Sequence, residues 1–197
     1  MDNQKSVGIL LFNDVEVLDF AGPFEVFALS EKPRGTKSFN VKTVSQDGEP
    51  VITVGGLRVL PEYSFETAPR FDILIVPGGY GARAIEVNNP ELIRWIGEQA
   101  ETANIVASVC TGAFLLGKAG LLEGKAATTH WAHTEELQNA YPSVEVRPGV
   151  KFVDQGNVMT SGGISAGINM SLYIVKKLLG REAASGVAKA MECDVVI

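Results

Sequence analysis

Short apolar runs alternate along the chain with segments in which apolar residues recur at helical spacing. The runs at 6–12 and 71–79 are continuous and the run at 39–45 alternates, as buried and half-buried strands do. The segments 18–30 and 164–180 have a helical period. Strands that alternate with helices predict an α/β fold, in which helices cover both faces of a mostly parallel central sheet.

The remaining segments fit the same plan. Pro90 stands where the first turn of a helix over 88–103 is expected, and Gly55-Gly56 separates two β-prone runs as in a hairpin. Further strands are expected at 105–109, at 125–130 and in short pieces over 144–161, and further helices after Cys110, at 133–141 and at 181–192. The helix at 18–30 is expected to bury one face that carries Phe20, Phe24 and Phe27.

Size and charge narrow the class of protein. The 197 residues are expected to form one domain over 1–197, with a net charge of -6 and no basic cluster, which argues against a nucleic-acid partner. No apolar run approaches the length of a membrane span, and the N-terminal run is too short for a secretory signal. Two distant cysteines make no disulfide framework. We therefore expect a cytoplasmic protein without a membrane partner, and no DNA-binding extension after Ile197.

Three familiar chemistries fit poorly. The stretch 163–167 matches G-x-S-x-G, but Ser165 follows both histidines, so the order of a serine-hydrolase triad is wrong. We interpret these small residues as allowing a helix to pack closely on the sheet. His130 ends a predicted strand and His133 begins a helix, so a metal site is not expected. No G-x-G-x-x-G follows the first strand, and we expect no cofactor.

Cys110 is the residue on which separate features converge. It ends the strand at 105–109, it opens a helix, and Gly112 allows a close backbone approach. N–H groups at the start of a helix lower the pKa of a thiol, and the thiolate is the nucleophilic form. A buried structural cysteine is the alternative. A thiol presented at such a turn is typical of a nucleophile.

Two other strand ends offer partners for this thiol. The Gly78-Gly79 turn follows the run at 71–79 and is a candidate source of a backbone N–H for a developing anion. Asp19 opens the first helix, at the same predicted edge of the sheet as Cys110, and is a candidate titratable partner. An ordinary helix N-cap is the alternative role for Asp19.

At this point the motifs resemble those of a known family. "SVCTGAFLLGKAGLLEGKAATTHW", with "LDFAGPFEVF" before it, "PGG" between, and "VDQGNVMTSGGISAGINMSL" after, resembles the ThiJ/PfpI superfamily along essentially the whole chain. The resemblance is strongest to the branch that holds isonitrile hydratases and the amidotransferase-like sensor domains of AraC-type regulators. It implies a flavodoxin-like, doubly wound sandwich.

The resemblance also implies a function and a site. The expected activity is hydration of isonitriles to N-substituted formamides, in which a thiolate attacks the isonitrile carbon and an acid manages protons and water. The implied alternative is a module that senses a small molecule or an oxidant without turnover. A homodimer is implied as well, whereas the apolar tail 193–197 with Cys193 has no assigned role. The implied catalytic residues are Cys110, Asp19 and Thr111, and the implied substrate- or oxyanion-binding residues are Gly79, Tyr80 and His130.

Departures from the superfamily pattern restrict the reaction. Thr111 stands where members of the superfamily with peptidase or deglycase activity often carry a histidine. No Cys-His dyad therefore forms at the turn after the strand 105–109. No histidine lies near 161–167, as an amidotransferase triad requires, and Asn169 replaces an expected aspartate. Protease and amidotransferase activities are therefore disfavoured.

Overall fold

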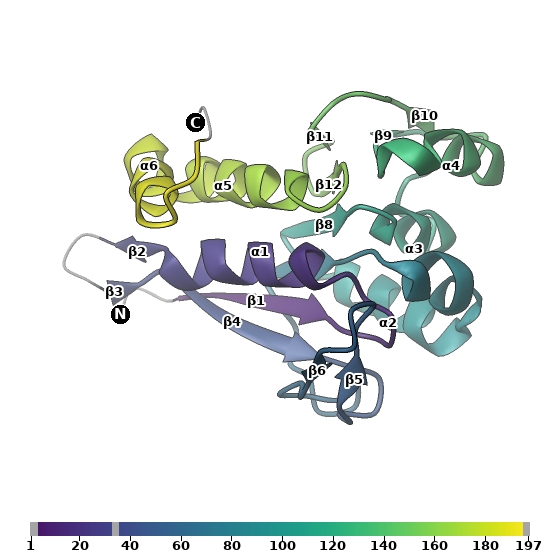
Figure 1. Ribbon diagram of the computed structural model, residues 1–197, viewed down its shortest axis with the longest axis horizontal. Helices are drawn as coiled ribbons and strands as arrows, with labels where there is room; N and C mark the ends of the chain where they lie inside the picture. The colour runs from purple at the N-terminus through teal and green to yellow at the C-terminus, as the bar shows by residue number, and fades with distance from the viewer. Residues whose placement is uncertain (1–3, 33–35, 195–197) are drawn as a thin grey trace.

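The computed structural model describes residues 4–32 and 36–194, and a six-stranded sheet forms their centre (Figure 1). Five neighbouring strands are parallel and one edge strand is antiparallel. In sheet order they are β4 (Phe39–Val44), β1 (Lys5–Leu10), β7 (Ile73–Val76), β8 (Ile105–Val109), β12 (Val158–Ser161) and the antiparallel β11 (Phe152–Asp154). The mostly parallel sheet expected from the sequence is confirmed.

Helices cover both faces of this sheet. In one layer, α1 (Val17–Leu29), α5 (Ala166–Leu179) and α6 (Arg181–Ala190) pack together. In the other layer, α2 (Pro90–Ala100) packs against α3 (Gly112–Lys118) (Figure 1). β7 and β8 are buried along their whole length because they lie in the middle of the sheet under both layers. The doubly wound sandwich is confirmed.

Smaller elements surround the sheet. The hairpin expected around Gly55-Gly56 is present as β5 (Val51–Ile52) and β6 (Arg58–Val59). The others are the pair β2 (Glu31–Lys32) and β3 (Thr36–Lys37), the pair β9 (Ala126–Ala127) and β10 (Glu145–Val146), the helix α4 (Thr134–Ala140), and the short helical turns η1 (Gly81–Ile85), η2 (Glu86–Asn88) and η3 (Trp131–His133).

Two expectations for local structure are wrong in part. The strand expected at 125–130 is only the two residues of β9, which pair with β10 outside the main sheet, because the chain turns away where Thr128 N–H donates to Thr160 Oγ1. Phe24 is 36% exposed, whereas Phe20 and Phe27 are buried. The buried face of α1 passes through Pro23 and lies to one side of Phe24.

The chain ends add little to this picture. The apolar tail expected over 193–197 falls partly outside the described residues, and within them the Cys193 N–H donates to the Ala188 carbonyl. Among the helices in the described ranges, none has the length and apolar character that crossing a membrane requires.

The order of the strands locates a site. Within the six-stranded sheet, the next strand after β1 in the chain, β4, lies on one side of β1. The strand after that, β7, lies on the other side. In doubly wound sheets, ligands bind at the carboxyl ends of the strands beside such a reversal. The segments that leave β1, β7 and β8 here carry Asp19, Gly78-Gly79 and Cys110.

Candidate active site

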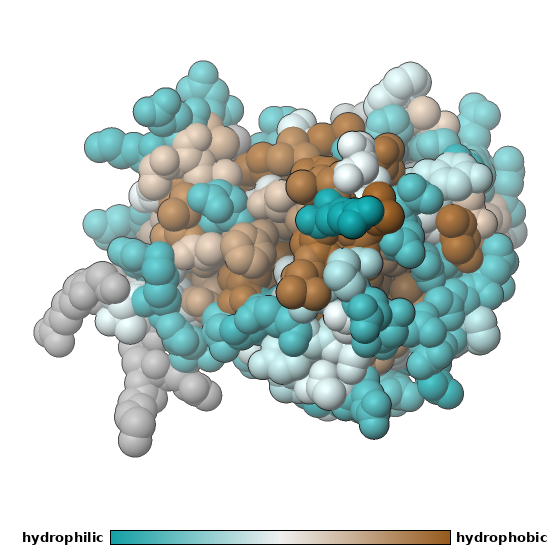
Figure 2. Space-filling model, turned by 60° about the horizontal axis from the view of Figure 1, so that its bottom comes forward, coloured by the Kyte–Doolittle hydropathy of each residue, from teal (hydrophilic) through white to brown (hydrophobic). Residues whose placement is uncertain are grey.

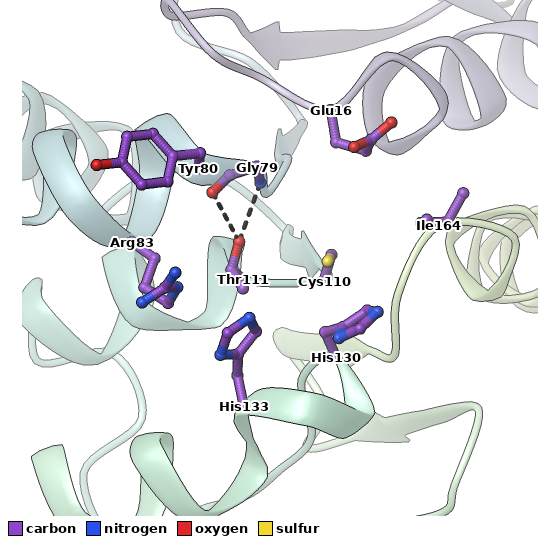
Figure 3. Close-up of a pocket in the computed structure, with 9 residues that line it drawn as sticks. All are labelled: Glu16, Gly79, Tyr80, Arg83, Cys110, Thr111, His130, His133 and Ile164. Carbon is purple, nitrogen blue, oxygen red and sulfur yellow. Dashed lines mark hydrogen bonds between the residues drawn. The ribbon is translucent and has the colours of Figure 1, made fainter. Parts of the chain in front are cut away.

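A cleft of about 230 Å³ lies at this edge of the sheet. Its lining comes from the segments after β1, β7, β8, β9 and β12 (Figure 3). The lining residues are Glu16, Gly79, Tyr80, Arg83, Cys110, Thr111, His130, His133 and Ile164. Five of the six predicted site residues therefore line one cleft, and the sixth, Asp19, lies buried beside it.

Cys110 occupies a strained turn between β8 and α3. Its φ is +56°, a left-handed conformation that costs a side-chain-bearing residue free energy and that persists only where the surroundings hold it. The Cys110 N–H donates to the carbonyls of Ser161 and Gly162 at 3.2 and 3.1 Å, and the Cys110 carbonyl accepts from Thr129 Oγ1 at 2.7 Å. A side chain at Gly112 would overlap the Val76 carbonyl, so the expected close backbone approach is present.

Asp19 lies within the first turn of α1 and is completely buried. Its Oδ2 accepts from the Gly78 N–H at 3.1 Å, its Oδ1 accepts from the Ile164 N–H at 3.2 Å, and the carboxyl group hydrogen-bonds the Cys110 thiol. The N-cap alternative is wrong, because Glu16 holds that position and Asp19 faces inward. The placement of Asp19 beside the thiol matches the expected partner.

Burial sets the protonation of this pair. Desolvation raises the pKa of Asp19 to about 7, against the opposing hydrogen bond from Gly78. Desolvation, followed by the negative charge of Asp19, raises the pKa of Cys110 to about 12, although the Thr111 N–H favours the thiolate. The prediction that the start of the helix lowers the pKa of the Cys110 thiol is therefore wrong in direction. Two adjacent anions are costly, so Asp19 and Cys110 share one proton and one negative charge above neutral pH.

Thr111 and the Gly78-Gly79 turn bind each other. The Thr111 hydroxyl accepts from the Gly79 N–H at 2.9 Å and donates to the Gly79 carbonyl at 3.1 Å (Figure 3). The Gly78 N–H is used by Asp19. Both backbone donors that the sequence offered to a developing anion are thus engaged within the protein. Glycine is required here, because side chains at Gly78 and Gly79 would overlap Thr111 and the backbone of Asp14.

The two histidines have opposite hydrogen-bonding arrangements. His130 Nδ1 accepts from the Ala132 N–H at 3.3 Å, and Gly163 leaves room for the ring because a Cβ there would overlap it. Burial, and then His133, lower the pKa of His130. His133 Nδ1 lies 2.9 Å from Glu136 Oε2, and Arg83 Nη1 lies 3.2 Å from Glu136 Oε1.

Four lining residues were not expected at the site from the sequence: Glu16, Arg83, His133 and Ile164. The sequence does carry a signal for His133, its three-residue spacing to Glu136. Ile164, with φ of +54°, belongs to the stretch interpreted as close packing, and that interpretation holds for Gly167, where a Cβ would press on Val109. Over residues 4–32 and 36–194, no three His, Cys, Asp or Glu side chains gather as metal ligands would.

Comparisons with known proteins bear on the family and the fold. The family model described as the DJ-1/PfpI family matches residues 5–177. The chain is 38% identical over 186 residues to an isonitrile hydratase of Pseudomonas putida, covering 94% of this chain and 77% of that protein. It is 28% identical over 187 residues to the HTH-type transcriptional regulator GbdR of Pseudomonas aeruginosa, covering 95% of this chain and 50% of the regulator. A THiJ/PfpI family protein from Pseudomonas syringae superposes with a TM-score of 0.86 at 26% identity, covering 99% of this chain and 77% of that chain.

Proposed function

The chain belongs to the DJ-1/PfpI family, and from that premise we propose that it is an enzyme that hydrates isonitriles to N-substituted formamides. The observation that carries the proposal is the pair of Cys110 and Asp19, which holds one exchangeable proton next to a small cleft. The 38% identity to an isonitrile hydratase along 94% of the chain supports the same reaction.

The first step uses the shared proton. The sulfur of Cys110 forms a bond to the terminal carbon of R–N≡C, and the proton of the pair moves to that carbon. The product is a thioimidate, Cys110–S–CH=N–R, and Asp19 is left as a carboxylate. An Asp19 pKa of about 7 suits this task, because a proton donor works best when its pKa lies near the working pH.

The second step consumes water. A water oxygen bonds to the thioimidate carbon, and one water proton goes to the substrate nitrogen. The C–S bond then breaks with its electron pair going to sulfur, and the remaining hydroxyl proton returns to the Asp19–Cys110 pair. The product R–NH–CHO holds the atoms of one isonitrile and one water, and the pair regains its single proton.

The test is formamide formation from cyclohexyl isonitrile, followed by chromatography. We expect turnover in the native chain and a loss of at least about 1000-fold in Cys110→Ala, because the covalent step cannot occur without the sulfur. Near-ultraviolet circular dichroism would show that the variant is folded. Equal formamide formation by the native chain and Cys110→Ala would exclude the cysteine mechanism.

Ligand sensing is the second candidate, and the similarity to GbdR along 95% of this chain favours it. A sensor would bind a small molecule in the same cleft without turnover. The rate at which iodoacetamide alkylates Cys110 separates the candidates when it is measured beside turnover. A reaction that rises through pH 7 with formamide formation indicates the enzyme, whereas the same rise without any formamide indicates a sensor.

Homodimer formation is part of the same proposal. Exposed apolar side chains gather on α1 and on the β5–β6 hairpin, a side of the molecule that Figure 2 turns forward. Exposed apolar side chains that gather on one side of a protein are typical of an interaction surface. The residues are Leu18, Phe24, Ile52, Val54, Leu57 and Leu60. Sedimentation equilibrium should give a dimer for the native chain and a monomer for Leu57→Glu/Leu60→Glu, whereas a native monomer would contradict the proposal.

A further inference from the structure

The hydrolytic step needs a base that the buried carboxyl group does not supply. Asp19 has no solvent-accessible surface and does not line the cleft. Two backbone N–H groups and the thiol occupy its oxygens. A water molecule that attacks a thioimidate from the cleft therefore meets other side chains first. Among the side chains that line the cleft, Glu16, His130 and His133 have a lone pair that can accept a proton. The guanidinium of Arg83 has none.

His130 is arranged as a donor rather than as a base. Its Nδ1 accepts the Ala132 N–H, so in the neutral ring the hydrogen resides on Nε2. Both nitrogen lone pairs of the neutral ring are then unavailable to a proton from water. The lowered pKa of His130 agrees with a ring that stays neutral.

His133 has the reverse arrangement. Glu136 Oε2 accepts a hydrogen bond at 2.9 Å from Nδ1, which therefore carries the hydrogen, and Nε2 keeps its lone pair. Arg83, from η1, holds the other oxygen of Glu136 and so fixes the carboxylate. Figure 3 shows the His133 ring directed toward Thr111, and its centroid lies 5.7 Å from that of His130.

We propose that His133 is the catalytic base for hydrolysis of the thioimidate and that Glu136, held by Arg83, is a positioning residue for it. The inference rests on the proposed isonitrile hydration. His133 Nε2 takes one proton from the attacking water as the water oxygen bonds to the thioimidate carbon. The imidazolium then gives that proton to the substrate nitrogen, so His133 leaves the step neutral. The C–S bond breaks as before, and the hydroxyl proton returns to the pair.

Glu16 is the competing base. Its carboxylate lines the cleft from the start of α1. The hydrogen bond from His133 Nδ1 to Glu136 Oε2 fixes the orientation of that ring, whereas within residues 4–32 and 36–194 no hydrogen bond orients the Glu16 carboxylate. The charged and titratable groups around His133 are Glu136, Arg83, His130, Glu16 and the Asp19–Cys110 pair.

The experiment separates the two chemical steps. Cyclohexyl isonitrile is mixed with the native chain, with His133→Gln and with Glu16→Gln, and intact mass and formamide are followed in time. In His133→Gln we expect turnover to fall about 100-fold or more, while the protein gains the mass of one isonitrile on Cys110. Glu16→Gln should turn over without accumulating the adduct. Adduct accumulation is a readout that a merely structural loss would not produce.

Chemical rescue and a matched pair of glutamates complete the test. Added imidazole should restore formamide release to His133→Ala, because it supplies the missing base. Glu136→Gln should accumulate adduct, whereas Glu135→Gln, the same change on an exposed neighbour that does not hold the His133 ring, should behave like the native chain.

The outcomes for the inference and for the proposed function differ. Native turnover that His133→Gln retains, or a His133→Gln variant that slows without any adduct, would overturn the role of His133 and leave the hydratase intact. Adduct accumulation in Glu16→Gln in place of His133→Gln would assign the base to Glu16. A native chain that gives neither formamide nor adduct would contradict the hydratase itself.

Discussion

Two aspartates stand at opposite ends of the same three strands, β1, β7 and β8, in very different surroundings. At the amino ends, Asp72 accepts hydrogen bonds from the Ser6 N–H and hydroxyl at 2.7 and 2.8 Å and from Asn104 Nδ2 at 3.3 Å. This carboxylate keeps contact with solvent. At the carboxyl ends, Asp19 is fully buried between two backbone N–H groups and a thiol.

The difference shows how one residue type serves two purposes. Asp72 accepts hydrogen bonds from residues at the starts of the neighbouring strands, so this side chain joins three strands. Burial around Asp19 exceeds what its donors offset, so the carboxyl group keeps a proton near neutral pH. Backbone strain follows the same division: Cys110 and Ile164, both with positive φ, adjoin Asp19. The predicted reactive pair therefore lies where the hydrogen bonds do not fully offset the cost of burial and where the backbone is strained.

Exchanging each aspartate for asparagine gives the largest expected contrast. Asp19→Asn removes the carboxyl group that shares the proton with Cys110 and passes it to the isonitrile carbon, and it should lower kcat/KM about 1000-fold, within the range typical of acid–base catalysis. Asp72→Asn should leave kcat/KM within about twofold, because it lies at the far edge of the sheet. Steady-state formamide assays measure both variants. Equal losses in the two would show that Asp19 acts only through folding.

Asp19 should also make the stability of the fold depend on pH. The folded pKa of Asp19, about 7, exceeds its ordinary 3.8, so the folded state binds the extra proton. Its contribution to stability is fully present below pH 3.8 and is lost as the pH rises to about 7, by at most about 4 kcal/mol.

Urea denaturation at pH 5 and pH 8 measures this loss. The native chain and Asp72→Asn should both lose stability between the two pH values, and Asp19→Asn should lose much less. A slope in Asp19→Asn as steep as that of the native chain would show that another group is responsible.

Removing the Asp72 carboxylate should affect the free energy of unfolding more than kcat/KM. Asp72→Ala leaves the Ser6 N–H and hydroxyl without their acceptor and should cost about 2 kcal/mol of unfolding free energy, as lost hydrogen bonds to a charged group do. Urea denaturation at pH 7 measures the cost, and kcat/KM should stay within about twofold. A large fall in kcat/KM would mean that this edge also shapes the cleft.

The sequence supported the fold and most of the site because the relevant signals are local. Apolar periodicity identified the strands and helices, and the rule that ligands bind at the carboxyl ends of parallel strands brought Cys110 and Gly79 to one edge. Asp19, Cys110 and Thr111 are adjacent as expected.

The direction of the thiol pKa depends on packing from distant segments, and the sequence could not supply it. Burial by the sheet and its helices, together with the nearby Asp19 charge, outweighs the donors at the helix start. Similarly, the pairing of His133 with Glu136 was visible as a spacing, but the contact of Glu136 with Arg83 of η1, which brings His133 to the cleft, joins segments far apart in the sequence.

Substitution of Thr111 should have the smallest effect on kcat/KM. Thr111 also has a counterpart at the amino ends of the strands. Its hydroxyl joins the turn after β7 to the turn after β8 through the N–H and the carbonyl of Gly79, much as Asn104 joins Asp72 at the other end. Thr111→Val keeps the shape but removes both hydrogen bonds to Gly79, so kcat/KM should fall about tenfold. Thr111→Ser should retain activity within about twofold, and Asn104→Ala should not alter it. If Thr111→Ser were as impaired as Thr111→Val, the methyl group rather than the hydroxyl would be holding the turn after β8.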